Sequence, residues 1–213
     1  MGDKTKLTGK QKLEVAIQTG LQAIPYVGAP LATAYFGSKQ VKEFNRLQEF
    51  YNQLSKDMES IKNSIVPIDM QYEDGLMSLI EQINSNIEKE HQNRKIQCYK
   101  NYMRNMLTNQ ITEYNYDKKK LFLEVLQSMS IIEIEVVSEL YKLEKNLMVK
   151  VSAFSRAGFD TYAFVGVVSK LKSYGFLKTQ QEQMFIGGGE DNLLNESVAI
   201  NDYGREFVEF VLQ

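Results

Sequence analysis

The sequence predicts a mainly α-helical chain, in which an elongated helical bundle or hairpin at residues 1–116 precedes an α+β domain at residues 117–213. Two observations carry this prediction. Apolar residues recur every three or four positions over long stretches of the first region, which is the period of an amphipathic helix. After residue 117 the apolar stretches become shorter, and turn-forming residues separate them. A chain of 213 residues is long enough to bury a sizeable core in one or two domains.

The most apolar part of the chain is the uncharged stretch at residues 15–38, VAIQTGLQAIPYVGAPLATAYFGS. Pro25, Gly28 and Pro30 interrupt it, so we expect a tight helical hairpin or a kinked helix rather than a straight one. Three roles fit: a buried hairpin between long helices, an element that inserts into a membrane on activation, and a membrane span. We favour the first. The candidate membrane- or partner-contacting residues are Ile24, Pro25, Val27, Gly28, Pro30, Leu31, Tyr35 and Phe36.

Two long helices are expected next, at residues 38–65 and about 71–107. The first has a heptad-like seam, which suits antiparallel packing or a coiled coil; its residues are Val41, Phe44, Leu47, Tyr51, Leu54, Met58, Ile61 and Ile65. In the second, the stretch at residues 88–95 is almost wholly polar, so it is either solvent-exposed or a joint. Residues 108–117 are expected to be a connector.

The last hundred residues predict a series of short elements. Helices are expected at residues 121–129 and after Ser130, with Glu133 in the capping-box position. An irregular stretch at residues 149–158 leads to a helix from Asp160 to Tyr174, which Gly175 ends. Strands are expected to begin at residue 176 and to return at residues 197–200, around the loop GGGEDN, before a final helix at residues 203–212.

This order of elements, with the pieces KLKSYGFL and INDYGREFVEF, resembles the winged-helix family over residues 118–213. The candidate partner or DNA face is Tyr162, Phe164, Lys170, Lys172 and Lys178. DNA is disfavoured, because the start of the helix is aromatic and apolar, and because Glu190 and Asp191 in the loop would repel phosphates. A face that binds protein is favoured, with Tyr162 and Phe164 as contact anchors or, alternatively, as core residues.

A second resemblance spans the whole chain. It combines Ile-Pro-x-x-Gly at residues 24–28, Phe-x-x-Leu-x-x-Phe at residues 44–50 and Tyr-Gly-x-x-Phe at residues 203–207. This pattern resembles bacterial proteins of the abortive-infection alpha type. The resemblance implies a role in defence against phage, and it transfers no site residue to this chain.

Residues that could carry chemistry are few. His91 is the only histidine and Cys98 the only cysteine, and neither has neighbours at the spacing of a triad or a zinc site. The loop GGGEDN lacks the GK[ST] ending of a phosphate loop. Basic residues between 95 and 120 alternate with tyrosines, which fits either single-strand binding or a solvated helix face with the tyrosines in the core; we favour the second.

We therefore expect a non-enzymatic interaction protein with no cofactor, no metal and no small-molecule substrate. Its expected partner is another protein or a second copy of itself. The formal net charge of −2 disfavours nucleic acid, although a winged-helix transcriptional regulator is the alternative function. The expected location is the cytoplasm, with membrane association on activation as an alternative.

Overall fold

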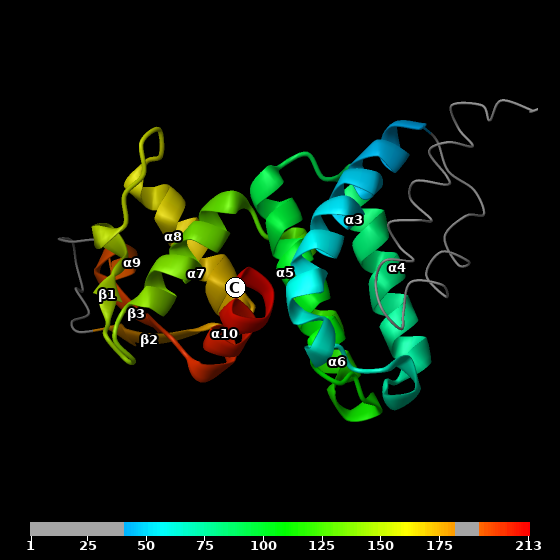
Figure 1. The fold of residues 1–213 in the computed structure, drawn as a ribbon. Coiled ribbons are helices and arrows are strands. Elements are labelled where there is room, and N and C mark those ends of the chain that lie inside the picture. The colour runs from blue at the N-terminus through cyan, green and yellow to red at the C-terminus, as the bar shows by residue number, and fades with distance from the viewer. Residues whose placement is uncertain (1–40, 182–191) are drawn as a thin grey trace, which may run out of the picture. The chain divides into compact units, whose positions relative to one another are not determined.

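The computed structural model describes residues 41–181 and 192–213, and these are mainly helical with one three-stranded antiparallel sheet (Figure 1). The prediction of a mainly α chain is confirmed. The chain divides into two compact units, Met1–Gln127 and Ser128–Gln213. The hairpin predicted at residues 15–38 lies outside the described residues.

The first unit is built from helices. They are α3 (Val41–Ile61), α4 (Glu73–Lys89), α5 (Asn93–Thr108) and α6 (Glu113–Ser128), with the short 3-10 turns η1 (Lys62–Ser64) and η2 (Ile68–Met70) between α3 and α4. The helix α3 packs against α4 and α5, and α4 packs against α5. The predicted seam supplies part of this core, because Leu47, Tyr51 and Leu54 are buried. They pack in a core that also contains Phe50, Leu76, Ile80, Ile83, Ile87, Tyr99, Tyr102, Met103, Met106, Phe122 and Leu126.

The single helix predicted at residues 71–107 is wrong, because the chain breaks at residues 90–92 into α4 and α5. The Glu90 carboxylate accepts the backbone N–H groups of His91 and Gln92, both at 2.9 Å. These bonds satisfy two backbone donors at the start of a new helix, and they compete with continued helix. Both alternatives for the polar stretch hold, because it contains the joint between α4 and α5 and most of its residues are exposed.

The helix α6 begins at Glu113, inside the predicted connector, and it packs in the first unit. The Tyr102 hydroxyl donates to the backbone oxygen of Lys119 at 2.7 Å, and the ring of Tyr116 lies edge-on to Tyr72 at 5.7 Å between centroids. The predicted boundary at 116/117 therefore falls within α6, whereas the two compact units divide between Gln127 and Ser128.

The second unit combines helices with the sheet. Its elements are α7 (Ile131–Lys142), β1 (Val149–Lys150), η3 (Val151–Ala153), α8 (Thr161–Ser173), β2 (Leu177–Gln181), α9 (Asn192–Asn195), β3 (Glu196–Ile200), α10 (Asp202–Phe207) and the π-helical η4 (Val208–Leu212). The strand order is β1-β3-β2, with Val198 opposite both Val149 and Thr179. The sequence predicted β2, β3 and the closing helix. It missed β1, which is only two residues long.

Local signals set the ends of α7 and α8 as predicted. Ser130 Oγ accepts the N–H of Glu133 at 3.4 Å and the Glu133 carboxylate accepts the N–H of Ser130 at 3.2 Å, so the capping box is present. Gly175 has a φ of 78° and ends α8, with its N–H donating to Lys172 O and the N–H of Phe176 donating to Leu171 O. Phe176 then packs on Phe207, with 4.6 Å between ring centroids.

Gly204 of α10 lies against Phe176 and Ile200, and a side chain does not fit there. A Cβ atom at Gly204 would lie 2.6 Å from Phe176 O and 2.9 Å from Ile200 Cγ1, whereas one at Gly166 would have no atom within 4 Å. We predict that Gly204→Ala destabilises the chain by about 1–3 kcal/mol, as overpacking does. The matched change Gly166→Ala should stabilise it by up to about 1 kcal/mol, because alanine favours a helix interior. Urea unfolding of both variants checks this, and an equal effect in the two would contradict it.

Candidate functional site

The first candidate element predicted from the sequence cannot be compared with the structure. Its residues lie outside the part of the chain that the structure describes; they are Ile24, Pro25, Val27, Gly28, Pro30, Leu31, Tyr35 and Phe36. The second candidate face lies on and beside α8, and it is described completely.

The helix α8 has one buried face and one exposed face. Its N-terminus is capped by Asp160, whose Oδ1 accepts the N–H of Tyr162 at 2.8 Å. The exposed face is a stripe at helical spacing, formed by Tyr162, Gly166, Ser169 and Ser173. Tyr162 is 55% exposed, and the other three residues are small and uncharged. This face therefore has one aromatic side chain at the start of the helix, followed only by small side chains.

Phe164 does not belong to this exposed face. It is 3% exposed, and its ring stacks on that of Phe154 with 6.0 Å between centroids and 17° between planes. Of the two alternatives for Phe164, the structure has core packing. Phe159, which the sequence analysis did not single out, is exposed just before the Asp160 cap, and Arg156 Cζ lies 5.2 Å from its ring centroid. The buried residues of α8, which are Phe164, Val167, Val168 and Leu171, recur at helical spacing, whereas Phe159 precedes the helix.

The lysines of the predicted face have partners within the second unit. Lys170 Nζ lies 3.2 Å from Glu133 Oε1 and donates to Ser128 O at 3.0 Å. Burial lowers the pKa of Lys170, but hydrogen bonds to Tyr174 and Glu133 outweigh this and the net shift of the pKa is upward. The ammonium group is therefore charged and balanced by a carboxylate.

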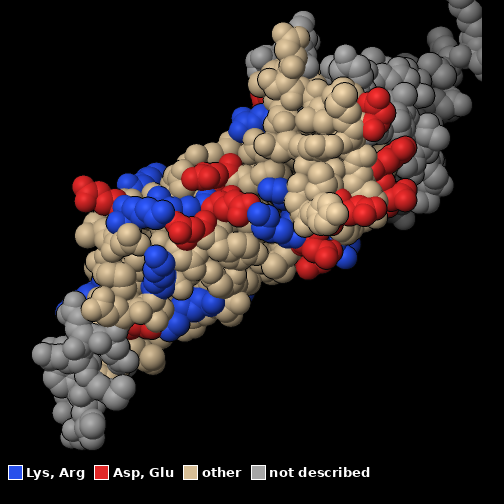
Figure 2. Space-filling view, turned by 90° about the horizontal axis from the view of Figure 1, so that it is seen from below, with Lys and Arg blue, Asp and Glu red and all other residues tan. Residues whose placement is uncertain are grey.

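The other two lysines are similarly engaged. Lys172 Nζ lies 2.6 Å from Glu196 Oε1, and Lys178 Nζ donates to Asn146 Oδ1 at 3.1 Å. A phosphate that bound Lys170 or Lys172 would have to compete with the glutamate that each of them already contacts. On the surface seen in Figure 2, acidic and basic side chains are likewise intermixed rather than gathered into a single basic area.

His91 and Cys98, which the sequence singled out for chemistry, lie in different surroundings. His91 is exposed, and its Nδ1 lies 3.8 Å from Glu90 Oε1. Cys98 is buried, and burial raises the pKa of its thiol to about 11 although Arg94 and Lys95 oppose the shift. The thiol is therefore protonated near neutral pH, whereas nucleophilic attack requires the thiolate. Among residues 41–181 and 192–213, no three His, Cys, Asp or Glu side chains are grouped to hold a metal ion.

The basic and aromatic residues of α5 form part of the core rather than a platform for bases. Tyr99 and Tyr102 are buried. Lys95 is buried as well, with its Nζ 2.9 Å from Gln127 O and 3.5 Å from Glu90 Oε2, and Lys100 Nζ lies 2.9 Å from Asp57 Oδ2. The favoured alternative, with the tyrosines in the core, is therefore observed for Tyr99 and Tyr102, whereas Tyr114 is fully exposed and Tyr116 is partly exposed.

Two hollows line the groove between α3 and α5, and no motif in the sequence indicated them. The first has a volume of about 260 Å³ and is lined by Arg46, Glu49, Phe50, Gln53, Asn93, Ile96 and Gln97. The second has about 460 Å³ and is lined by Asp57, Ile61, Ser64, Arg104, Asn105 and Thr108. Acidic, basic and amide side chains are mixed in both, so neither has the polarity of a dedicated site for one class of ligand.

Comparison with known proteins adds no identification. No protein-family model matches the chain, and neither a curated protein nor a solved structure matches it. Within the described ranges, the helices are all too short or too polar to cross a bilayer.

The burial of Cys98 makes a prediction about its reactivity. Because its pKa is about 11 rather than 9.0, its thiolate fraction at pH 8 should be roughly 100-fold smaller than in the unfolded chain. We expect iodoacetamide to label the native chain at least 100-fold more slowly than the chain in guanidinium chloride. The raised pKa also means that the thiol contributes stability below pH 9, and that this contribution is lost as the pH rises toward 11. Equal labelling rates in the two conditions would contradict the buried position.

Proposed function

We propose that this chain is a non-enzymatic interaction protein, and that its second unit is a winged-helix domain that binds protein through the exposed face of α8. One observation carries this proposal. The exposed stripe of α8 has no charged residue, and the nearby Lys170 and Lys172 are both paired with glutamates. A DNA-reading helix instead presents polar or basic side chains to base edges and phosphates.

The arrangement of the second unit supports the winged-helix part of the proposal. The order α7, β1, η3, α8, β2, β3, α10 and the sheet order β1-β3-β2 are those expected of that fold. In this fold α8 would occupy the position of the recognition helix. The fold by itself does not specify a ligand, so the chemistry of the α8 surface decides between protein and DNA.

The exposed α8 face has features of a protein-contacting surface. Tyrosine is enriched among residues that dominate binding energy, and Tyr162 is more than half exposed at the start of the helix. Gly166 has open space around it, and Ser169 and Ser173 are small, so the main chain of a partner could approach α8 closely. The partner is another protein or a second copy of this chain.

The proposed biological setting is bacterial defence against phage, as a component that acts through protein contacts. It is supported by the sequence pattern shared with abortive-infection alpha-type proteins. Conditional membrane insertion of residues 15–38 is a further part of this proposal, supported by their apolar composition alone.

A DNA-binding experiment separates this proposal from the transcriptional regulator. We expect the full chain to bind fluorescent duplex DNA weakly, with an affinity that stays within twofold when Lys170 and Lys172 are both changed to Gln. The reason is that these ammonium groups already neutralise Glu133 and Glu196. Tight, salt-dependent binding that is lost in the double variant would instead support the regulator.

An infection experiment tests the α8 face directly. If the chain protects cells that express it, Tyr162→Ser should reduce that protection at least tenfold in a plaque assay, because the aromatic anchor is lost. The matched control is Leu147→Ser, since Leu147 is an exposed apolar residue of the same unit in the segment between α7 and β1. Full protection by Tyr162→Ser, or equal loss in both variants at equal protein levels, would argue against this face.

A further inference from the structure

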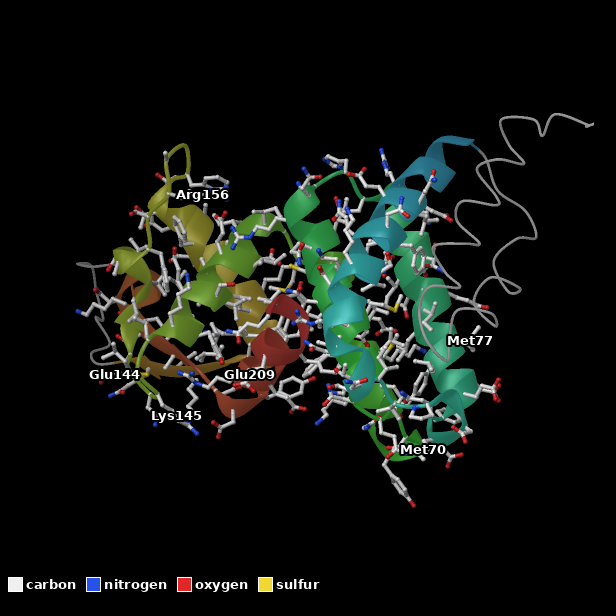
Figure 3. The ribbon with its side chains drawn as sticks, in the orientation of Figure 1. Met70, Met77, Glu144, Lys145, Arg156 and Glu209 are labelled. Carbon is white, nitrogen blue, oxygen red and sulfur yellow. The ribbon has the colours of Figure 1, made fainter. Side chains whose placement is uncertain are left out.

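We propose that one end of the first unit binds a basic, partly apolar peptide segment of a partner protein. We call this surface the 70/114 tip. It lies where η2 ends and where α4 and α6 begin, and Figure 3 labels Met70 there. Its residues are Asp69, Met70, Glu73, Asp74, Glu113 and Tyr114.

Two segments about forty residues apart in sequence are bonded together to make this surface. The N–H of Tyr72 donates to Ile111 O at 2.8 Å, and the side chain of Gln110 donates to Met70 O. The Asn115 side chain then donates to Gln110 O at 2.9 Å, which ties the loop to the first turn of α6. Met70 and Tyr114 are thus held at the same end of the unit by defined bonds.

The centre of the 70/114 tip is apolar and exposed. Tyr114 is 100% exposed and Met70 is 59% exposed, although both side chains could gain free energy by leaving water. A methionine side chain adapts to differently shaped partners, and the face of a tyrosine ring attracts lysine or arginine. These two residues therefore suit a partner segment that carries both apolar and cationic side chains.

The border of the 70/114 tip is acidic. Asp69, Glu73, Asp74 and Glu113 are all exposed, and none of them forms an ion pair with another described residue. Lys118 and Lys120 are the exposed cations of α6, and they follow one turn later. The local excess of negative charge is complementary to a basic segment and repels a nucleic acid or an anionic membrane.

Gln71 is a separate observation at the same place. It is only 9% exposed, and its Oε1 accepts the N–H of Ile111 at 2.6 Å. Its Nε2 is buried and has no hydrogen-bond partner. A buried donor without an acceptor is unfavourable, so the free energy gained from the Gln71–Ile111 hydrogen bond is partly offset at this place.

Peptide binding to the full chain tests this inference. Three labelled 12-residue peptides serve as probes, composed of Lys and Leu, of Lys and Ser, and of Glu and Leu. We expect fluorescence anisotropy to give at least tenfold tighter binding of the Lys/Leu peptide than of either other peptide. Equal binding of the Lys/Ser peptide would overturn the inference, because it would reduce the interaction to general charge attraction.

Variants locate the binding. The double change Glu73→Lys and Asp74→Lys should weaken binding of the Lys/Leu peptide at least tenfold, and Tyr114→Ser at least fivefold. Glu124→Lys is the matched control, because Glu124 is an exposed carboxylate further along α6, and it should change binding less than twofold. Each variant changes an exposed residue. The double change also places two cations in the first turn of α4, where they oppose the helix dipole, so binding is compared well below the melting temperature measured for each variant. An equal loss of peptide binding in the Glu124→Lys control would overturn the proposal. It would also be overturned if the chain bound no peptide and instead self-associated through the 70/114 tip.

Discussion

Within each of the two units, basic side chains bind the carbonyl ends of helices from distant parts of the sequence. The last carbonyls of a helix have no partner within it and form the negative end of the helix dipole. At the end of α4, Arg46 donates to Glu88 O at 2.8 Å, and at the end of α6, Lys95 donates to Gln127 O at 2.9 Å. At the end of α7, Arg205 donates to Tyr141 O at 3.2 Å and to Leu143 O at 3.1 Å. In each case the donor comes from an element distant in sequence. These helices lack the terminal glycine that completes α8, so the cations provide the caps.

Use of the cations inside each unit limits what they can do for a ligand. Lys170 is the clearest case, since it binds both Glu133 and the last residue of α6. A sequence with 25 Lys and Arg residues therefore shows little cationic surface on α8. On the exposed stripe of α8 the side chains are uncharged, and those around Met70 and Tyr114 include four carboxylates. This is the physical reason for proposing protein contacts, both at the uncharged face of α8 and at the 70/114 tip, which has an apolar centre and an acidic border.

Some features set by neighbouring residues could be predicted from the sequence, whereas features that need distant residues could not. The capping box at Ser130 and the glycine end at Gly175 depend on side chains within three residues. The break at Glu90 has the same polar composition as a solvated helix, so composition could not distinguish them. The burial of Phe164 depends on Phe154 from another element. The tip needs two loops about forty residues apart, and no periodicity indicates that pairing.

The position of Cys98 has a consequence for the environments in which the chain can keep its fold. It is the only thiol in the sequence, and it is enclosed by the helices of the first unit with its proton retained. No disulfide can form within one chain, and the buried sulfur is shielded from glutathione and peroxide. Thiol–disulfide exchange should therefore leave the native state unchanged. Any cysteine introduced on its surface would react alone, which offers a direct way to place a single probe at a chosen residue.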